Sequence, residues 1–91
     1  MALENCSDSN VLLNLGFAAL WIGEILEAKN DYGSAYVAFR RAFSKWKLVS
    51  PPRARTAMEG ADRVREMIPL SIAVPISDWE CDKAFLDWLY K

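Results

Sequence analysis

The sequence predicts an all-α fold, a single small domain of four helices over residues 1–91. Apolar residues recur at three- and four-residue steps in four separate segments, which is the period of an amphipathic helix. Short polar or proline-containing stretches separate these segments. Hydrophobic residues make up 53% of the 91 residues, which provides for a globular core, and the length is that of one domain.

The first predicted helix covers residues 10–29, after a capping residue supplied by Ser7, Asp8 or Ser9. Its apolar residues occupy most of the helix circumference: Val11, Leu12, Leu15, Phe17, Ala18, Ala19, Leu20, Trp21, Ile22, Ile25 and Leu26. A helix that is apolar nearly all round is usually buried on several sides. We therefore expect it to be the central helix of the domain.

The same apolar run is interrupted by Asn14 and Glu24 and is short for a membrane span. The N-terminus lacks the basic start and the small-residue cleavage site of a signal peptide. We therefore expect a cytoplasmic protein that does not enter a membrane.

The second predicted helix covers residues 32–47, with Asp31 as its capping residue. Its apolar face is formed by Tyr32, Ala35, Tyr36, Phe39, Ala42, Phe43 and Trp46. Because the connection to the first helix is so short, the two helices are expected to lie antiparallel.

The third predicted helix covers residues 52–68, because proline suits the first turn of a helix and Pro69 stops it. Charge pairs are expected within it, between Glu59 and Arg63 and between Asp62 and Arg65. Residues 70–76 are expected to form an extended connector laid over the core.

The last predicted helix begins at a capping box formed by Ser77 and Glu80, with Ile76 and Cys81 at the staple positions. It extends to Tyr90 and is expected to cap the domain, because its aromatic residues need a surface to pack against.

Within residues 16–49, small, large and aromatic residues alternate at the spacing of a tetratricopeptide repeat. The matching positions are Ala19, Ile22, Gly23, Leu26, Tyr32, Ala35, Phe39 and Ala42. The chain thus resembles that family over one repeat, although Ala19 replaces the usual Trp, Lys47 replaces the closing Pro, and no second repeat follows. The resemblance implies a closely packed helical hairpin and a groove for peptides or helices lined by first helices. Its candidate residues here are Asn14, Phe17, Trp21, Ile25 and Lys29.

Charge is unevenly distributed, although the net charge is only −1. The middle of the chain holds basic residues with no acid among them: Arg40, Arg41, Lys45, Lys47, Arg53 and Arg55. The last helix is acidic, so a positive strip is expected beside acidic faces. Three interpretations of the strip stay open: a solvated face, a contact with an acidic protein surface, or a contact with nucleic-acid phosphates.

The familiar arrangements for catalysis and metal binding are missing from the sequence, and the carboxylate pairs Glu24/Glu27 and Asp78/Asp82 are interpreted as solvated or capping residues. The chain has no His, and its two cysteines, Cys6 and Cys81, have neither metal-ligand spacing nor an activating neighbour. Free thiols are expected rather than a disulfide. The glycines are scattered and form no phosphate-binding loop. We therefore expect no enzyme, no cofactor and no metal.

The expected function is that of a non-catalytic protein–protein interaction module: an adaptor, a chaperone-like subunit or a small inhibitor, including phage-type inhibitors. The candidate partner-binding residues are Phe17, Trp21, Ile25, Arg40, Arg41, Lys45 and Lys47, with the apolar ones as anchors and the basic ones orienting the approach. Whether Trp21 belongs instead to the core stays open. The alternatives are a nucleic-acid-associated protein and a self-associating structural subunit.

Overall fold

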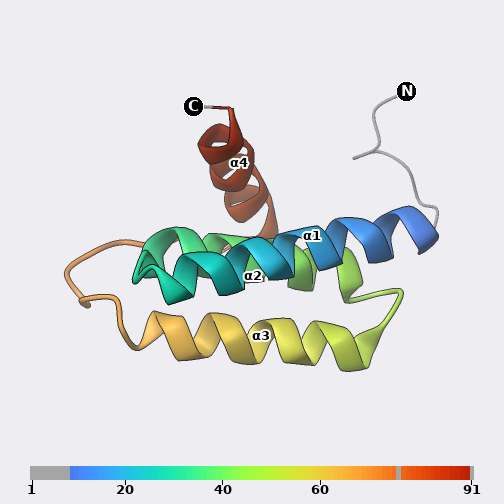
Figure 1. Ribbon diagram of the computed structural model, residues 1–91, viewed down its shortest axis with the longest axis horizontal. Helices are drawn as coiled ribbons and strands as arrows, with labels where there is room; N and C mark the ends of the chain where they lie inside the picture. Colours follow the sequence, from blue (N-terminus) through green and yellow to red (C-terminus); the bar gives the residue numbers. More distant parts are fainter. Residues whose placement is uncertain (1–8, 76, 91) are drawn as a thin grey trace.

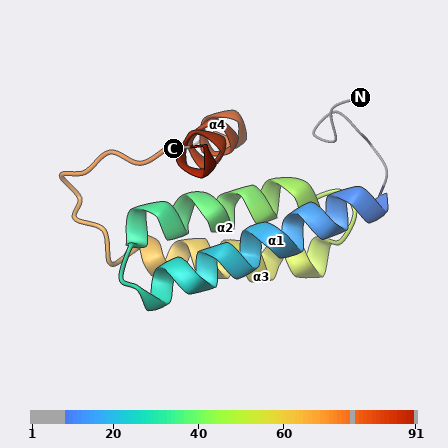
Figure 2. The same cartoon turned by 45° about the horizontal axis from the view of Figure 1, so that its top comes forward.

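The computed structural model describes residues 9–75 and 77–90, and within these residues it contains helices and no strand. The helices are α1 (Ser9–Ala28), α2 (Tyr32–Trp46), α3 (Pro51–Arg65) and α4 (Asp78–Leu89). In Figure 1, α1, α2 and α3 lie side by side, and the chain reverses direction at each connection. Figure 2 places α4 across α2, on the side that faces away from α3. The predicted all-α class with four helices is confirmed.

The central helix is α2 and not, as predicted, α1. Each of the other three helices packs against α2. α1 buries only a narrow face of small residues and one leucine: Gly16, Ala19, Gly23 and Leu26. The prediction was wrong because the width of an apolar stripe does not reveal whether a neighbour covers it. α4 packs on the side of α2 that carries its basic residues.

The turn between α1 and α2 is closed by backbone hydrogen bonds. Asn30 adopts a left-handed conformation with φ 64°, which asparagine tolerates better than most residues. Its N–H donates to the carbonyl of Glu27, and the N–H of Asp31 donates to that of Leu26 at 2.9 Å. Asp31 then caps α2, because its carboxylate accepts from the N–H of Ser34. The predicted cap and short hairpin connection are confirmed.

The third helix ends at Arg65, three residues before the predicted end. Proline disfavours helix in the preceding residue and clashes with the carbonyl four residues back, which here belongs to Arg65. The next residues are bonded in a tighter turn, in which Ile68 donates to the carbonyl of Arg65 at 3.1 Å. The pKa of Arg63 is raised first by its hydrogen bonds to Glu27 and also by the charge of Glu59, which therefore acts on Arg63 as predicted. The side-chain hydrogen bonds of Arg63, however, go to another helix, because its guanidinium makes two 2.7 Å hydrogen bonds to Glu27 of α1 and so joins α3 to α1.

Large aromatic rings on α2 fit against glycines on its neighbours. A Cβ on Gly23 of α1 would lie 3.0 Å from the Phe39 ring, and a Cβ on Gly60 of α3 would lie 2.9 Å from the same ring. About two turns further along α2, Trp46 lies against Gly16 of α1. Its indole N–H donates to the carbonyl of Leu13 at 3.1 Å. The absence of a side chain at these glycines allows α1 and α3 to approach α2 closely.

The segment between α3 and α4 was predicted to lie over the core. In the structure most of it is exposed instead. Leu70 is 91% exposed and Ile72 is also exposed, whereas Val74 packs against the cluster around Phe39. Ser77 caps α4 by accepting from the N–H of Glu80 at 3.1 Å, as the capping box predicts. The predicted roles of Cys6, Ser7, Asp8 and Ile76 lie outside the described residues.

Candidate protein-binding surfaces

The outer face of α1 is an exposed stripe of largely apolar residues. Opposite the face that packs on α2, the exposed positions follow alternating four- and three-residue steps: Asn14, Ala18, Trp21, Ile25 and Ala28. Trp21 is 61% exposed and Ile25 is 56% exposed. We call these five residues the α1 stripe. Trp21 therefore does not belong to the core, which resolves the alternative left open by the sequence.

Phe17 connects the α1 stripe to the core. Its ring lies 6.0 Å from that of Trp21 and 5.0 Å, edge to face, from that of the buried Trp46. The guanidinium of Arg53 lies 5.3 Å from the centre of the same ring. The structure thus brings Phe17, Trp21 and Ile25 together on one helix, and the Trp21 ring is supported from one side.

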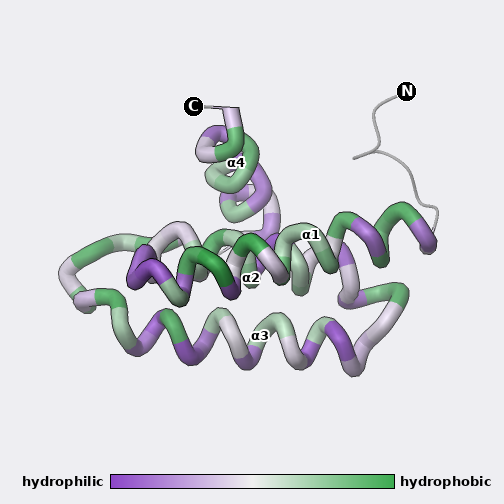
Figure 3. Tube along the Cα trace, in the orientation of Figure 1, coloured by the Kyte–Doolittle hydropathy of each residue, from purple (hydrophilic) through white to green (hydrophobic). Residues whose placement is uncertain are grey.

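Figure 3 shows that α1 carries more hydrophobic residues than α3, whose length is marked by hydrophilic ones. By length and composition, α1 is a helix able to cross a membrane, and only 22% of the relevant segment is buried. Core helices of soluble proteins, which are mostly buried, and signal sequences near an N-terminus satisfy the same criterion. In this structure α1 packs against α2 and leaves the α1 stripe uncovered by the other described residues.

The predicted basic strip on α2 lies under α4, and its cations face aspartates. Arg40 and Lys47 both reach Asp78, at 3.4 and 2.5 Å. Arg41 and Lys45 both reach Asp82, each at 3.3 Å. The expectation of a positive strip beside an acidic face is confirmed, with both faces in the same chain. We call these four cations of α2 the basic strip from here on; Arg53 and Arg55 are exposed on α3.

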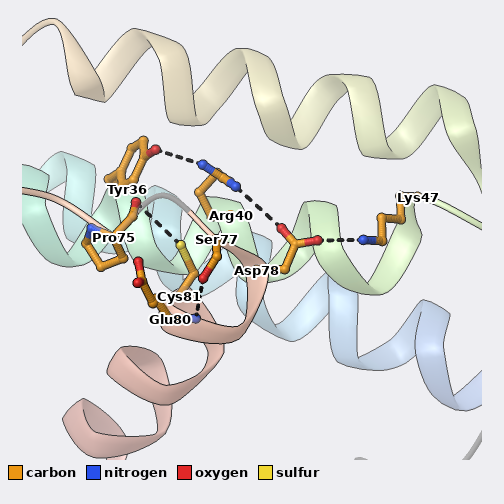
Figure 4. A network of polar contacts seen from close by, with 8 residues as sticks. All are labelled: Tyr36, Arg40, Lys47, Pro75, Ser77, Asp78, Glu80 and Cys81. Carbon is orange, nitrogen blue, oxygen red and sulfur yellow. Dashed lines mark hydrogen bonds and ion pairs between the residues drawn. The ribbon is translucent and has the colours of Figure 1, made fainter.

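Arg40 and Arg41 of the basic strip make further contacts besides these ion pairs. Figure 4 shows Asp78 between Arg40 and Lys47, and Arg40 donating to the Tyr36 hydroxyl at 2.8 Å. The Arg41 side chain is only 4% exposed, and its guanidinium lies 4.9 Å from the centre of the Phe85 ring. Such a buried arginine needs counter-charges, because an unpaired buried cation is very costly. Asp82 supplies a counter-charge to Arg41.

The pKa values at this interface reflect burial and these ion pairs. Burial alone would raise the pKa of Asp78, but hydrogen bonds from Lys47 and Arg40 and their positive charges outweigh it, so the pKa lies below its ordinary value. Burial raises the pKa of the Cys81 thiol, and the charge of Arg40 offsets this only in part. Cys81 is a free cysteine with no exposed surface, which makes it a poor nucleophile while α4 is docked.

The sequence analysis expected acidic faces beside the strip but did not identify Asp78 and Asp82 as the residues that pair with it. A signal was present, because Asp78 and Asp82 are four residues apart on α4 and Arg41 and Lys45 are four apart on α2. Residues at this spacing share one helix face, so two such faces are complementary in register. What the spacing does not indicate is that the two helices meet.

A cleft of about 550 Å³ lies between the start of α2 and the second half of α4. Its walls are mostly apolar, with Asp31 and Asp87 among them, and its lining includes Val37, Pro75, Ala84, Phe85 and Trp88. Among residues 9–75 and 77–90, no group of three or more metal-ligating side chains is found. The cleft shows no arrangement of groups that points to a reaction.

Comparisons of the chain with protein-family models, with curated proteins and with solved structures found no match.

Proposed function

We propose that this chain is a non-catalytic protein-interaction module that binds a partner protein with the outer face of α1. The observation that carries the proposal is the α1 stripe, with Trp21 61% and Ile25 56% exposed on a helix whose opposite face is packed. Tryptophan is among the residues that most often dominate binding energy at interfaces. The action is steric: the module occupies a surface of its partner, as an adaptor, a chaperone-like subunit or an inhibitor would.

The size of the apolar surface supports this role. A tryptophan of this exposure leaves roughly 150 Å² in water, and burying that area contributes on the order of 4 kcal/mol before the costs of association. The Trp21 ring also rests against Phe17, which is held by Trp46. A ring that is already positioned loses less conformational entropy on binding than a free one.

We also propose that α1 and α2 form a hairpin of the tetratricopeptide type. The support comes from the small positions of the pattern, since Ala35 and Ala42 have no exposed surface and Gly23 lies against Phe39. In such a hairpin the first helix lines the binding groove, which is the role proposed for α1. α3 packs on α2 and leaves the α1 stripe uncovered.

The nucleic-acid alternative receives less support. Each cation of the basic strip has an aspartate of α4 within 4 Å, so phosphates would have to displace those carboxylates. Self-association through the α1 stripe uses the same surface as the proposal and is distinguished by the experiment.

The test uses a photo-crosslinking amino acid placed in the full chain at position 25, and in a control chain at position 72, which is also exposed. A protein crosslinked from position 25 and not from position 72 is then purified, and its affinity is measured for the wild type and for Trp21→Ala/Ile25→Ala. We expect a loss of at least about 100-fold in affinity. The matched control is Trp79→Ala, because Trp79 is 71% exposed and belongs to α4, which packs mainly against α2.

Equal affinity of the wild type and Trp21→Ala/Ile25→Ala would overturn the proposal. So would crosslinks from position 25 that join only two copies of this chain, because they would assign the α1 stripe to self-association. Sedimentation of the wild type across a wide concentration range checks that outcome independently.

A further inference from the structure

The cleft between the start of α2 and the second half of α4 has the size and the walls of a small-molecule site. Its volume is about 550 Å³, and sites for small organic ligands usually occupy roughly 300–1,000 Å³. In Figure 1, α4 rises steeply from the layer of the other three helices, which leaves room beside it at the start of α2. The apolar walls are formed by Val37, Pro75, Ala84, Phe85 and Trp88. The cleft is open in this structure, so no helix has to move for a ligand to enter.

Phe85 and Trp88 give the cleft an aromatic wall. Their ring centres are 6.0 Å apart, and the ring planes are tilted by 42°. Phe85 is buried and already has the guanidinium of Arg41 at 4.9 Å from its ring centre. The Trp88 ring is half-buried, and no cation of the described residues lies over it. Because a tryptophan ring attracts cations more strongly than other aromatic rings do, this wall favours a ligand that carries a positive charge.

Two carboxylates from different helices line the same cleft, Asp31 at the start of α2 and Asp87 in the last turn of α4. Asp31 accepts from the backbone N–H of Ser34, which is a neutral donor, and no cation of the described residues pairs with it. Asp87 pairs with Lys83 at 3.2 Å, but both side chains are more than half exposed and Lys precedes Asp, which is the weaker order. None of the described residues that line the cleft is a cation.

The ends of the two helices leave the cleft negative. The last turn of α4 contains Asp87 and no described basic residue, although the negative end of a helix dipole is stabilised by cations and not by acids. The positive end of α2 carries about half an elementary charge, which the full charge of Asp31 outweighs. A cation bound in the cleft would therefore relieve the repulsion between Asp87 and the carbonyl end of α4.

We infer that this cleft binds a small organic cation, namely an amine on an aromatic or branched apolar body. The apolar body lies against Val37, Ala84 and Trp88, and the ammonium group donates to Asp31 or Asp87. The walls are helices whose backbone groups are largely bonded within the helix, so an extended peptide would find few main-chain partners there. No residue of α1 lines the cleft, and the inference does not depend on the function proposed for the α1 stripe.

The experiment titrates the full chain with 2-phenylethylamine, and with 2-phenylethanol as a neutral ligand of nearly the same shape. Nuclear magnetic resonance follows the amides of Val37 and Ala84 and the indole N–H of Trp88, while the amides of Ala18 and Ile25 should not shift. The dissociation constant of the amine is expected to be on the order of 1 mM, as suits a ligand of its size. The alcohol should bind at least about tenfold more weakly, because hydrogen bonds between charged groups are the stronger ones.

Asp31→Asn/Asp87→Asn removes both charges and is expected to abolish the preference for the amine over the alcohol. This variant should fold, because asparagine caps a helix about as well as aspartate does and an exposed ion pair contributes little. The matched control is Glu59→Gln/Asp62→Asn, which removes two exposed carboxylates of α3 that do not line the cleft. The control should keep the preference of the wild type.

Equal affinity of the wild type for the amine and the alcohol would overturn the inference, as would a preference that survives Asp31→Asn/Asp87→Asn. Absence of shifts at Val37, Ala84 and Trp88, at amine concentrations tenfold above the expected dissociation constant, would also overturn it. Tighter binding of 3-phenylpropionate than of the amine would assign the cleft to anions at the start of α2. At least about tenfold tighter binding of a capped tripeptide with arginine between two leucines would assign it to a segment of a partner protein. Either assignment overturns the inference.

Discussion

Replacing Gly60 by alanine tests the close packing of α3 on α2. The added Cβ would lie 2.9 Å from two atoms of the Phe39 ring. That ring is 1% exposed and is bounded on its other side by Gly23 of α1, so it has little room to move away. Overpacking of this kind costs about 1–3 kcal/mol, and confinement on both sides favours the upper end.

Alanine also favours the helical state over glycine by about 1 kcal/mol in a helix interior. The two effects oppose each other, and we expect Gly60→Ala to lower the free energy of unfolding by about 2 kcal/mol. Urea denaturation followed by circular dichroism measures this, and thermal unfolding should show a fall of about 4–8 °C for each kcal/mol in a domain of this size.

Gly33→Ala is the matched control. Gly33 lies in the first turn of α2, and an added Cβ there meets no atom within 4 Å. Its φ is not positive, so alanine is accommodated without backbone strain. This variant should be neutral or more stable than the wild type by up to about 1 kcal/mol. Gly60→Ala is expected to lower the free energy of unfolding and Gly33→Ala to leave it unchanged or raise it. Comparing the two variants therefore separates the cost of overpacking from the gain in helix propensity.

A Gly60→Ala variant as stable as the wild type, or more stable, would refute the packing described for Phe39. A double-mutant cycle with Phe39→Leu sharpens the result. The smaller side chain should relieve part of the cost, so the two changes together should cost less than the sum of each alone.

Three further outcomes are expected. Gly16→Ala should cost more than Gly60→Ala, at least about 3 kcal/mol, because Trp46 occupies the position of the new Cβ; urea denaturation measures it. The pKa of Asp78 is lowered from 3.8, so its contribution to α4 docking is fully present above pH 3.8 and is lost as the pH falls through the lower, folded value. The protection of the α4 amide N–H groups against hydrogen exchange, relative to those of α2, should therefore fall in that acid range, and unchanged protection would contradict the ion-pair account. Trp21→Ala should leave the free energy of unfolding within about 0.5 kcal/mol of the wild type, since its ring lies mostly in solvent; a loss above 2 kcal/mol would place it in the core.

Local chemistry predicted the helices well. Asp31 and Ser77 mark helix starts because their side chains satisfy free N–H groups of the first turn, and both caps are present. The effect of Pro69 was underestimated, because its clash reaches the carbonyl of Arg65, four residues earlier. Helix caps and proline clashes involve residues within about four positions of one another, so they can be predicted from the sequence alone.

The arrangement of the helices was less predictable, for a physical reason. Arg41 looks like a surface residue in a sequence, yet its side chain is 4% exposed because Asp82, 41 residues further along, neutralises it and Phe85 covers it. Conversely, Trp21 looks like core and is exposed. Apolar or charged character gives the cost of burial, but only the tertiary partners determine which side chains are buried.

The position of α2 between the other helices has a consequence for the order of folding. α1 and α3 adjoin α2 in the chain, so their contacts close short loops, and such contacts form early and fast. α4 reaches α2 only across the whole of α3 and the segment after it. The three-helix layer is thus expected to form before α4 docks, with transition-state structure strong at Ala42 and weak at Phe85. During synthesis, which proceeds from the N-terminus, Asp78 and Asp82 reach the basic strip only after the rest of the domain has been made. Each newly made chain therefore passes through an interval in which Arg41 has not yet met Asp82.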